Sequence, residues 1–541
     1  MAATLVLAAC GAPLTPLATA PSPAPALSPE ALAAGARSSP ALPAVPLVTG
    51  PLVARVVYPT ANALIQSRDS NFIFGSVGNG TATLTINGVP VHVWPNGAYL
   101  AFLPVPAADA PQYDFVVATG SDTVRLSHPV RLLPAARVDT IPAEPVVADS
   151  IATAAPPPPP RLTVADPSPV YVALGSAPDS TVADTDRVII GRPVPRGTYK
   201  WFFLPGTVVR QISRDSDFVR VRLDSALDVW VAAEDVVALD SGVTPPRRVV
   251  GNARVAPGSD YTDLVLPIGT RPPYAVEQSG SSVILTLYGT RATTDIIGYR
   301  ANDSVVRTVE WMQEASDRAR YTVHLRERPF GYLVFWDNGN LVLRLRRRPA
   351  VNAGRPLQGL TIAVDPGHPP IGATGPTGLW EPQATLWVGE RLAAMLRSRG
   401  ATVVMTRTTM EPVALGDRPT IARRANAHLL VSIHLNALPD GVNPFRVQGT
   451  GTYFFRAQAE PLARAVQRGL VAQLRLPDLG VYYDNLALTR PTWMPSILCE
   501  GAFLMMPDQE AGMRTPQFQE AYARGIADGI EEYFRALPND R

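Results

Sequence analysis

The pattern of hydrophobic and polar positions changes near residue 355. From residue 51 to about 350, short runs alternate apolar and polar residues between turn-forming residues, as in ATLTINGVPVHVW at 82–94. Asn87-Gly88 in that run is typical of a tight hairpin turn. This part of the chain is therefore predicted to form small all-β modules.

From residue 355 onward, short apolar runs alternate with segments of helical spacing. Short apolar strands between helices favour an α/β fold with a mainly parallel or mixed sheet flanked by helices. The predicted strands are 361–364, 402–406, 429–433 and 496–500, and the predicted helices are 383–399, 417–427, 460–474 and 516–537.

Proline-rich segments divide the chain into parts. The chain has 541 residues, which is too long for one domain, and 56 of them are proline. The stretches 11–47 and 136–160 are dense in proline and alanine, so they are predicted to be extended linkers. The predicted units between and after them are 48–135, 161–245, 246–350 and 355–541.

Charge and cysteine content narrow the class of protein. The 48 basic and 46 acidic residues nearly balance, which argues against a nucleic-acid partner, because such a surface needs clustered excess positive charge. Lys200 is the only lysine. Only Cys10 and Cys499 are cysteines, so no disulfide framework is expected.

Cys10 lies in LVLAACG, which resembles the lipobox of bacterial lipoproteins. The resemblance implies that residues 1–10 are a signal remnant and that Cys10 is a lipidation site. The membrane would then be a partner through a lipid anchor. No Lys or Arg precedes Arg37, so the positive start of a signal peptide is missing, and a start codon assigned too late would explain this. An ordinary cysteine in an apolar tail is the alternative.

Four stretches carry candidate chemistry at the ends of predicted strands. They are TIAVDPGH at 361–368, GPTGLWE at 375–381, SIHLNA at 432–437 and LCEGAF at 498–503. With MTR at 405–407, Arg418 and the AN pair at 425–426, they resemble the zinc-dependent N-acetylmuramoyl-L-alanine amidases over about residues 357–537. That family cuts the amide joining muramic acid to the stem peptide of the cell wall.

The resemblance implies a Zn²⁺ site made by His368, Glu381 and His434. Ends of neighbouring strands meet at one edge of an α/β sheet, so the wide spacing of these residues is no obstacle. Two imidazoles and one carboxylate leave a fourth position for water, as in catalytic zinc sites. Each histidine taken alone would more often be structural.

The resemblance also implies that Glu500 is the general base, and Asn436 is a candidate substrate-binding residue. Glu500 follows an apolar run, where a carboxylate is costly unless it is used or paired. A structural salt bridge is its alternative role.

Two further residues near these motifs are predicted to play no part in the chemistry. His428 lies six residues before His434, about 20 Å along one strand, so the two cannot share a metal ion. It is predicted to be a surface residue at the start of the strand. Strand alternation points Cys499 away from Glu500, so Cys499 is predicted to be a small buried hydrophobic residue.

The upstream units resemble known β-modules. Residues 48–135 look like a bacterial Ig-like β-sandwich, 161–245 loosely like an SH3-like module, and 246–350 like the AMIN-type domains that precede cell-wall amidases and bind the wall. The run RLRRR at 344–348 is predicted to be a strand end that passes into solvent.

The sequence departs from the family pattern near the metal motif and after the third strand. Pro369-Pro370 stand where the family usually has glycines, and they are expected to stiffen the loop beside the metal. The connector at 437–449 is too short for the autoinhibitory helix that some members carry. Restraint on activity is therefore expected to come from location or from the N-terminal modules.

The prediction for the whole chain is an exported zinc hydrolase of the periplasm or cell envelope, anchored as a lipoprotein. Its substrate and partner would be peptidoglycan, cleaved at the muramoyl–L-alanine amide for wall remodelling or daughter-cell separation. Two alternatives remain open: a zinc peptidase acting on the stem peptide, and a catalytically inactive wall-binding protein.

Overall fold

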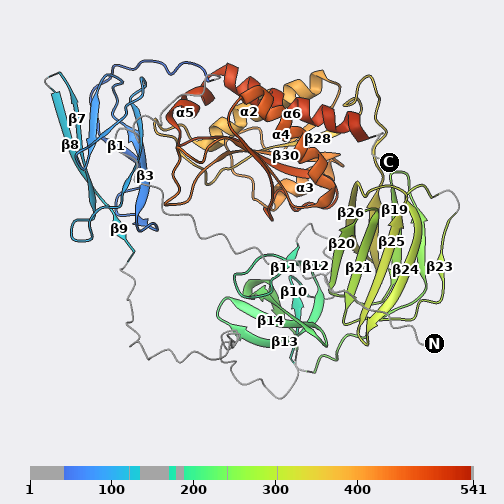
Figure 1. The fold of residues 1–541 in the computed structure, drawn as a ribbon. Helices are drawn as coiled ribbons and strands as arrows, with labels where there is room; N and C mark the ends of the chain where they lie inside the picture. Colours follow the sequence, from blue (N-terminus) through green and yellow to red (C-terminus); the bar gives the residue numbers. More distant parts are fainter. Residues whose placement is uncertain are drawn as a thin grey trace, which may run out of the picture.

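The computed structural model describes residues 42–120, 122–133, 170–177, 188–240, 242–300 and 303–537 (Figure 1). Three β-modules precede one α/β module, as predicted. Cys10, most of the first predicted linker and all of the second lie outside the described residues. In the part of the chain that is described, no helix is long and apolar enough to cross a membrane.

The first β-module is a sandwich of two sheets. Its core lies between them and includes Ile73, Tyr99 and Phe115. Asn87 and Gly88 both have positive φ at the turn between two strands, which confirms the predicted hairpin. The sheets are β1-β3-β6 and β5-β4-β7-β8, with β2-β9 as a small parallel pair: β1 (Arg55–Tyr58), β2 (Leu64–Ile65), β3 (Ser70–Ser76), β4 (Thr83–Ile86), β5 (Val89–Val91), β6 (Ala98–Pro104), β7 (Gln112–Thr119), β8 (Asp122–Pro129) and β9 (Arg131–Leu132).

The second β-module is built on one five-stranded sheet and a two-stranded one. The order of the larger sheet is β15-β14-β13-β10-β16, and β11 pairs with β12. Its elements are β10 (Tyr171–Leu174), β11 (Ile189–Gly191), β12 (Trp201–Phe203), β13 (Thr207–Asp215), β14 (Phe218–Asp224), β15 (Leu227–Ala232), η1 (Ala233–Asp235) and β16 (Val236–Ala238).

The third β-module packs a five-stranded sheet on a four-stranded one. Their orders are β23-β18-β19-β27-β26 and β20-β21-β25-β24, and β17 pairs with β22. The strands are β17 (Val249–Val250), β18 (Ala253–Pro257), β19 (Tyr261–Pro267), β20 (Tyr274–Ser279), β21 (Ser282–Tyr288), β22 (Arg291–Ala292), β23 (Ile297–Gly298), β24 (Val306–Ala315), β25 (Arg318–Leu325), β26 (Gly331–Asp337) and β27 (Asn340–Arg346).

The α/β module has a mixed six-stranded sheet in the order β29-β28-β30-β33-β31-β32. Only the β31–β33 pair is antiparallel, so the predicted mainly parallel or mixed sheet is confirmed. Its elements are β28 (Thr361–Pro366), α2 (Glu381–Ser398), β29 (Thr402–Met405), α3 (Asp417–Arg424), β30 (Leu429–Asn436), β31 (Thr450–Phe454), η2 (Ala457–Ala459), α4 (Glu460–Leu474), β32 (Asp478–Tyr483), β33 (Ser496–Phe503), α5 (Pro507–Met513) and α6 (Pro516–Ala536).

Helices cover both faces of this sheet (Figure 1). Ile362 and Val364 of β28 pack into the large core under α2, α4 and α6, whereas Ala363 between them packs with Ala422 of α3. This alternation explains why β28 is apolar throughout rather than at every second residue. The four predicted helices are confirmed, while β31, β32 and α5 were not predicted. Glycine inside β31 and β32 weakens their strand pattern.

The first β-module contacts the connector at 437–449 of the α/β module. The Asp440 carboxylate accepts hydrogen bonds from the Tyr58 hydroxyl, from the Gln66 backbone N–H at 2.8 Å and from Asn71 Nδ2 at 3.1 Å. Beside this group, aromatic residues of β3 pack against residues that follow Glu500, among them Phe503 and Met505. The connector is therefore held by another module rather than by a helix of its own.

Arg346 at the end of β27 docks the third β-module on the α/β module. It is 4% exposed and donates to the backbone oxygens of Ala427 at 2.5 Å and Asn426 at 2.9 Å. Arg344 pairs with Asp263 within its own module at 2.8 Å. The prediction that 344–348 passes into solvent is wrong, because the carbonyl groups after α3 need donors and this strand supplies them.

Candidate metal centre

The structure brings together the three predicted metal ligands. His368 follows β28, Glu381 begins α2, and His434 lies near the end of β30. Their ligand atoms all lie within 4.8 Å of one another. Glu381 Oε1 is 3.2 Å from His368 Nε2 and 3.3 Å from His434 Nδ1. The predicted grouping is confirmed.

These separations fit a tetrahedral zinc site. Zn–N and Zn–O bonds of about 2.0–2.1 Å imply ligand–ligand distances of about 3.4 Å at tetrahedral angles. The distances of 3.2 and 3.3 Å from Glu381 Oε1 to the two histidine nitrogens are close to that value. Two imidazole nitrogens and one carboxylate oxygen are also the donor set that catalytic zinc prefers, so the residues present fit Zn²⁺.

Close packing at the strand ends makes this arrangement possible. β28 and β30 run parallel with Pro366 opposite Ile433, so their carboxyl ends meet at one edge. A Cβ on Gly367 would lie 2.5 Å from the His434 ring, so only glycine fits between the two histidine segments. His368 itself has φ of +62°, a conformation that only surrounding contacts can hold in a non-glycine residue.

A buried ion pair supplies some of those contacts. Asp365 is fully buried and accepts hydrogen bonds from Ser432 Oγ at 2.6 Å and from Arg418 Nη1 at 2.8 Å. The other terminal nitrogen of Arg418 donates to the backbone oxygen of His368 at 2.7 Å. Arg407 donates to the Gly367 oxygen at 2.9 Å. Sequence reasoning placed both arginines in the family motifs but gave them no role; they hold the loop that carries His368.

Hydrogen bonds fix the ionisation and orientation of Glu381. Burial by itself would raise the pKa of this carboxyl, but hydrogen bonds from His368 and His434, with their charges, hold its pKa well below the usual range. Its two oxygens also accept from the backbone N–H groups of Leu435 and Ala373, at 3.0 and 2.9 Å. The side chain is therefore an oriented carboxylate, the form that binds a metal ion.

Glu500 lies next to the ligands on the neighbouring strand. β33 runs parallel to β30, with Glu500 opposite His434. Its Oε2 is buried and has no hydrogen-bond partner among the described residues. Burial, and then the nearby Glu381 carboxylate, raise the pKa of Glu500 well above its usual range. No salt bridge to a described residue explains this carboxylate.

Asn436 and Cys499 flank the centre. Asn436 lies two residues past His434, after an irregularity in the β30–β33 pairing, and its side chain bonds to the Tyr453 hydroxyl. Cys499 is fully buried and unpaired, and burial raises the pKa of its thiol, as expected of a small hydrophobic residue.

His428 is half-buried rather than a fully exposed surface residue, and its contacts are structural. Its Nδ1 accepts a hydrogen bond from the Thr361 backbone N–H at 2.9 Å, which ties the start of β30 to β28. Burial and the nearby Arg346 guanidinium lower the pKa of His428 to about 4. The docking of the third β-module, which covers this residue, was not visible from strand spacing.

Comparison with known proteins gives the family. Residues 362–532 match the family model described as N-acetylmuramoyl-L-alanine amidase. The uncharacterised protein YqiI of Bacillus subtilis is 31% identical over 198 residues, which are 36% of this chain and 93% of that protein. The chain belongs to the N-acetylmuramoyl-L-alanine amidase family. Its membership rests on the α/β module, which is an amidase domain with a His–Glu–His metal site.

Two named amidases are similar to the same module. The amidase LytC of Bacillus subtilis is 32% identical over 33% of this chain and 36% of its own length. The solved structure of the amidase AmiC2 of Nostoc punctiforme is 32% identical, covers 32% of this chain and 98% of that one, and has a TM-score of 0.31. The chain thus spans about a third of LytC.

Proposed function

We propose that the whole chain is an extracytoplasmic zinc amidase that hydrolyses the bond between N-acetylmuramic acid and L-alanine in peptidoglycan. The observation that carries this is the cluster of His368, Glu381 and His434 with Glu500 opposite His434 on the next strand. Its role would be cell-wall remodelling or separation of daughter cells.

The residues of the centre divide the chemistry between them. His368, Glu381 and His434 would hold Zn²⁺, which supplies a water nucleophile near neutral pH and polarises the amide carbonyl. Glu500 Oε2 would take a proton from the attacking water and pass it to the departing nitrogen of L-alanine. Its raised pKa favours holding that proton between the two steps. Asn436, beside Tyr453, would orient the substrate.

The upstream modules would place this domain on its substrate. We assign an Ig-like fold to the first β-module, an SH3-like fold to the second and an AMIN-like, wall-binding role to the third. Cys10 would carry a lipid anchor. The first β-module binds the connector at 437–449, which supports control of the active site by the N-terminal modules. Removal of residues 1–354 should therefore change the rate or the site of cleavage on intact walls.

Digestion of purified sacculi tests the activity. The full chain should release free stem peptides that begin with L-alanine, and mass analysis identifies them. Removal of zinc with a chelator, or the change Glu500→Gln, should stop the release. Shortened peptides still attached to glycan would show a peptidase instead, and tight binding to sacculi without any product would show an inactive wall-binding protein.

A further inference from the structure

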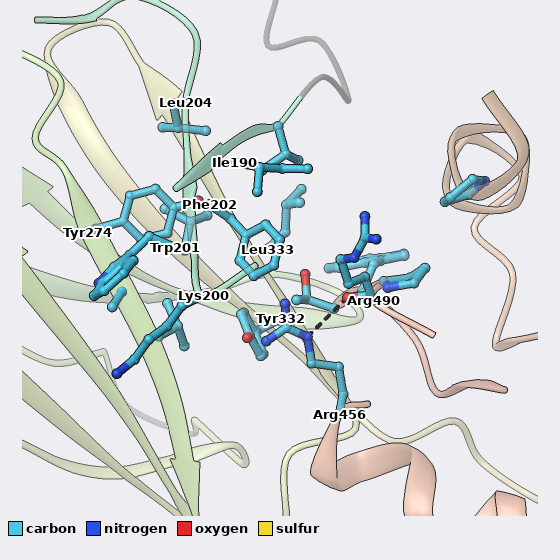
Figure 2. Close-up of a pocket in the computed structure, with 18 of the residues that line it drawn as sticks. Ile190, Lys200, Trp201, Phe202, Leu204, Tyr274, Tyr332, Leu333, Arg456 and Arg490 are labelled. Atoms are coloured by element: carbon cyan, nitrogen blue, oxygen red, sulfur yellow. Dashed lines mark hydrogen bonds between the residues drawn. The ribbon is translucent and has the colours of Figure 1, made fainter. Parts of the chain in front are cut away.

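A cavity of about 1140 Å³ lies where the second β-module, the third β-module and the α/β module meet. We call it the junction pocket. Figure 2 shows Arg456 and Arg490 of the α/β module facing Phe202 of the second β-module, with Tyr332 of the third close by. Its volume is that of a ligand site rather than of an ion site.

Aromatic side chains from all three modules line the junction pocket. They include Trp201 and Phe202 of β12, Tyr274 and Tyr332 of the third β-module, and Trp493 before β33. Such faces bind apolar groups and the faces of sugar rings. The metal ligands and Glu500 are not among the lining residues, so the pocket is separate from the metal centre.

Positive charge exceeds negative charge in the lining. Glu277 and Asp417 are its acidic residues. The basic ones are Lys200, Arg318, Arg423, Arg424, Arg456 and Arg490. Arg318 is paired with Asp224 at 2.7 Å, so the positive charge available to a ligand rests on Lys200, Arg456 and Arg490, and this charge favours an anionic ligand.

Three guanidinium groups gather at one side of the pocket without a carboxylate: Arg456 and Arg490 line it, whereas Arg192 lies behind them and does not. Those of Arg192 and Arg490 lie 4.6 and 4.7 Å from the centre of the same Tyr199 ring. Arg456 donates from Nε to the backbone oxygen of Arg490 at 3.0 Å, and its guanidinium lies 5.3 Å from the Phe202 ring. None of the three forms an ion pair with a carboxylate of the described residues.

One polar atom of this arginine cluster is buried and unpartnered. Arg192 Nη1 has no hydrogen-bond partner among the described residues. Burial is the main cause that lowers the pKa of Arg490; Tyr199 raises this pKa, and the charges of Arg456 and Arg192 lower it further. Arg192 does not line the pocket, so it adds positive charge behind Arg490 rather than a contact, and mutually repelling cations cost free energy until an anion compensates for them.

Guanidinium groups bind carboxylates through paired hydrogen bonds, and the aromatic walls accept a sugar or apolar body. A fragment of peptidoglycan offers both, because its glycan carries a peptide that ends in a carboxylate. We propose that the junction pocket is a second, non-catalytic site that binds such a carboxylate-bearing muropeptide. This inference rests on the proposed function, which makes peptidoglycan the substrate of the same chain.

The junction pocket also borders a helix that supports the metal centre. Asp417 and Thr420 of α3 line it, and Arg418 between them donates to the His368 backbone oxygen at 2.7 Å. A muropeptide in the pocket would therefore bridge the three modules and contact the helix that holds the His368 loop.

The only lysine of the chain gives a direct test, because Lys200 lines the pocket and is exposed. The full chain carrying Glu500→Gln, to prevent turnover, is treated with an amine-reactive ester, and the extent of Lys200 acylation is measured by peptide mapping. A soluble disaccharide-tetrapeptide should slow acylation of Lys200 at least about threefold, whereas the same probe with amidated carboxylates should not. The N-terminal amine serves as the internal control.

Three results would overturn the inference. They are no protection by the charged probe, equal protection by the amidated probe, and equal protection by inorganic phosphate or pyrophosphate, which would make the pocket a phosphate site. Release of stem peptides from sacculi is measured separately with the wild-type chain. If stem peptides are released but Lys200 is not protected, only this inference is wrong. If Lys200 is protected but no stem peptides are released, the proposed activity is wrong.

Paired variants test the arginine cluster. Arg456→Gln with Arg490→Gln should raise the Kd of the charged probe at least about tenfold, as read from Lys200 protection. Arg125→Gln with Arg254→Gln removes the same charge from exposed positions that form no ion pair with a described residue and should leave the Kd within about twofold. Equal Kd values for both pairs contradict the inference. If the variant with Arg456→Gln and Arg490→Gln does not fold, the comparison of the charged and amidated probes on the chain with both arginines still tests the inference.

Discussion

The metal centre and the arginine cluster beside the junction pocket each hold one ionisable side chain with a buried, unpartnered atom, and one side chain is acidic while the other is basic. At the metal centre the atom is Glu500 Oε2, and in the arginine cluster it is Arg192 Nη1. The surroundings differ. Around Glu500 the other buried charges are satisfied, since Asp365 is paired with Arg418 and Glu381 is bonded at both oxygens. Around Arg192 the neighbours are further arginines and aromatic rings.

The difference indicates what each site does. A buried polar group without a partner costs about 1–3 kcal/mol, so it persists where a ligand compensates for it. One unpaired carboxylate in an otherwise rigid, satisfied network is suited to moving a proton within a fixed geometry. Several guanidinium groups that lack a carboxylate partner and lie among aromatic faces are suited to binding an anion without reacting with it.

Loss of a metal ligand should have the largest effect. Glu381→Gln removes the anion between the two histidines, so zinc content should fall at least about tenfold and stem-peptide release by about 10⁴ or more, since the nucleophile depends on the metal. Elemental analysis measures the zinc content, and sacculus digestion measures the release of stem peptides. Glu390→Gln, an exposed change on the same helix, is the control and should alter neither. Normal zinc content in Glu381→Gln would remove this residue from the ligand set.

Loss of the unpaired carboxylate should abolish turnover but not metal binding. Glu500→Gln should reduce the rate of stem-peptide release by about 10²–10⁴, the usual contribution of a general base, with zinc content unchanged. Glu520→Gln on the exposed face of α6 is the matched control. Full activity of Glu500→Gln would refute its assigned role.

Breaking the buried ion pair should destabilise the amidase domain. Arg418→Met leaves the Asp365 charge uncompensated, so the free energy of unfolding should fall by about 3–5 kcal/mol. Denaturant unfolding of the full chain, followed by a probe in the amidase domain, measures this. Arg464→Met breaks an exposed pair with Glu460 and should cost less than about 1 kcal/mol. Equal costs would mean that the Asp365 network is not rigidly paired.

His428 should make stability depend on pH. Its pKa is about 4 in the folded chain and 6.5 in the unfolded chain, so the unfolded state binds more protons between these values. The contribution of neutral His428 to the free energy of unfolding is fully present above pH 6.5 and is lost as the pH falls toward 4. Relative to His428→Gln, the wild-type chain should lose about 1–2 kcal/mol of stability between pH 7.5 and pH 5. Parallel pH curves for the two proteins would show that His428 is not neutral when folded.

Removal of the unpaired guanidinium should have the smallest effect and the opposite sign. Arg192→Met removes a buried unsatisfied donor and one of the repelling charges, so the free energy of unfolding should rise by about 1 kcal/mol in the absence of ligand. The same change should weaken binding of the charged muropeptide. Arg125→Met, at an exposed position, should change stability by less than about 0.5 kcal/mol. A loss of stability in Arg192→Met would mean that its contacts with Tyr199 and Phe218 outweigh the unpaired donor.

The sequence by itself determined the architecture of the amidase domain and the members of its metal centre. Apolar runs fixed the strands of a sheet covered on both faces, and parallel strands bring their carboxyl ends to one edge. The resemblance of their motifs to the amidase family grouped His368, Glu381, His434 and Glu500 before any coordinates, and the strand-end geometry agrees with that grouping. The roles of Arg407 and Arg418 were not assigned, since a motif shows which residues recur together but not which carbonyl oxygens they bond.

Only the tertiary structure decided how the modules meet. Arg346 reads as a surface residue at a strand end, yet it is buried against the carbonyls after α3. Arg192 and Arg490 are nearly 300 residues apart and converge on one tyrosine ring. Periodicity reports which face of an element is buried, but not which module covers it. In a chain whose lysine and arginine residues are all arginine except one, no spacing marks Arg192, Arg456 and Arg490 for a common cluster. These arginines come together only because the second β-module, the third β-module and the α/β module pack against one another.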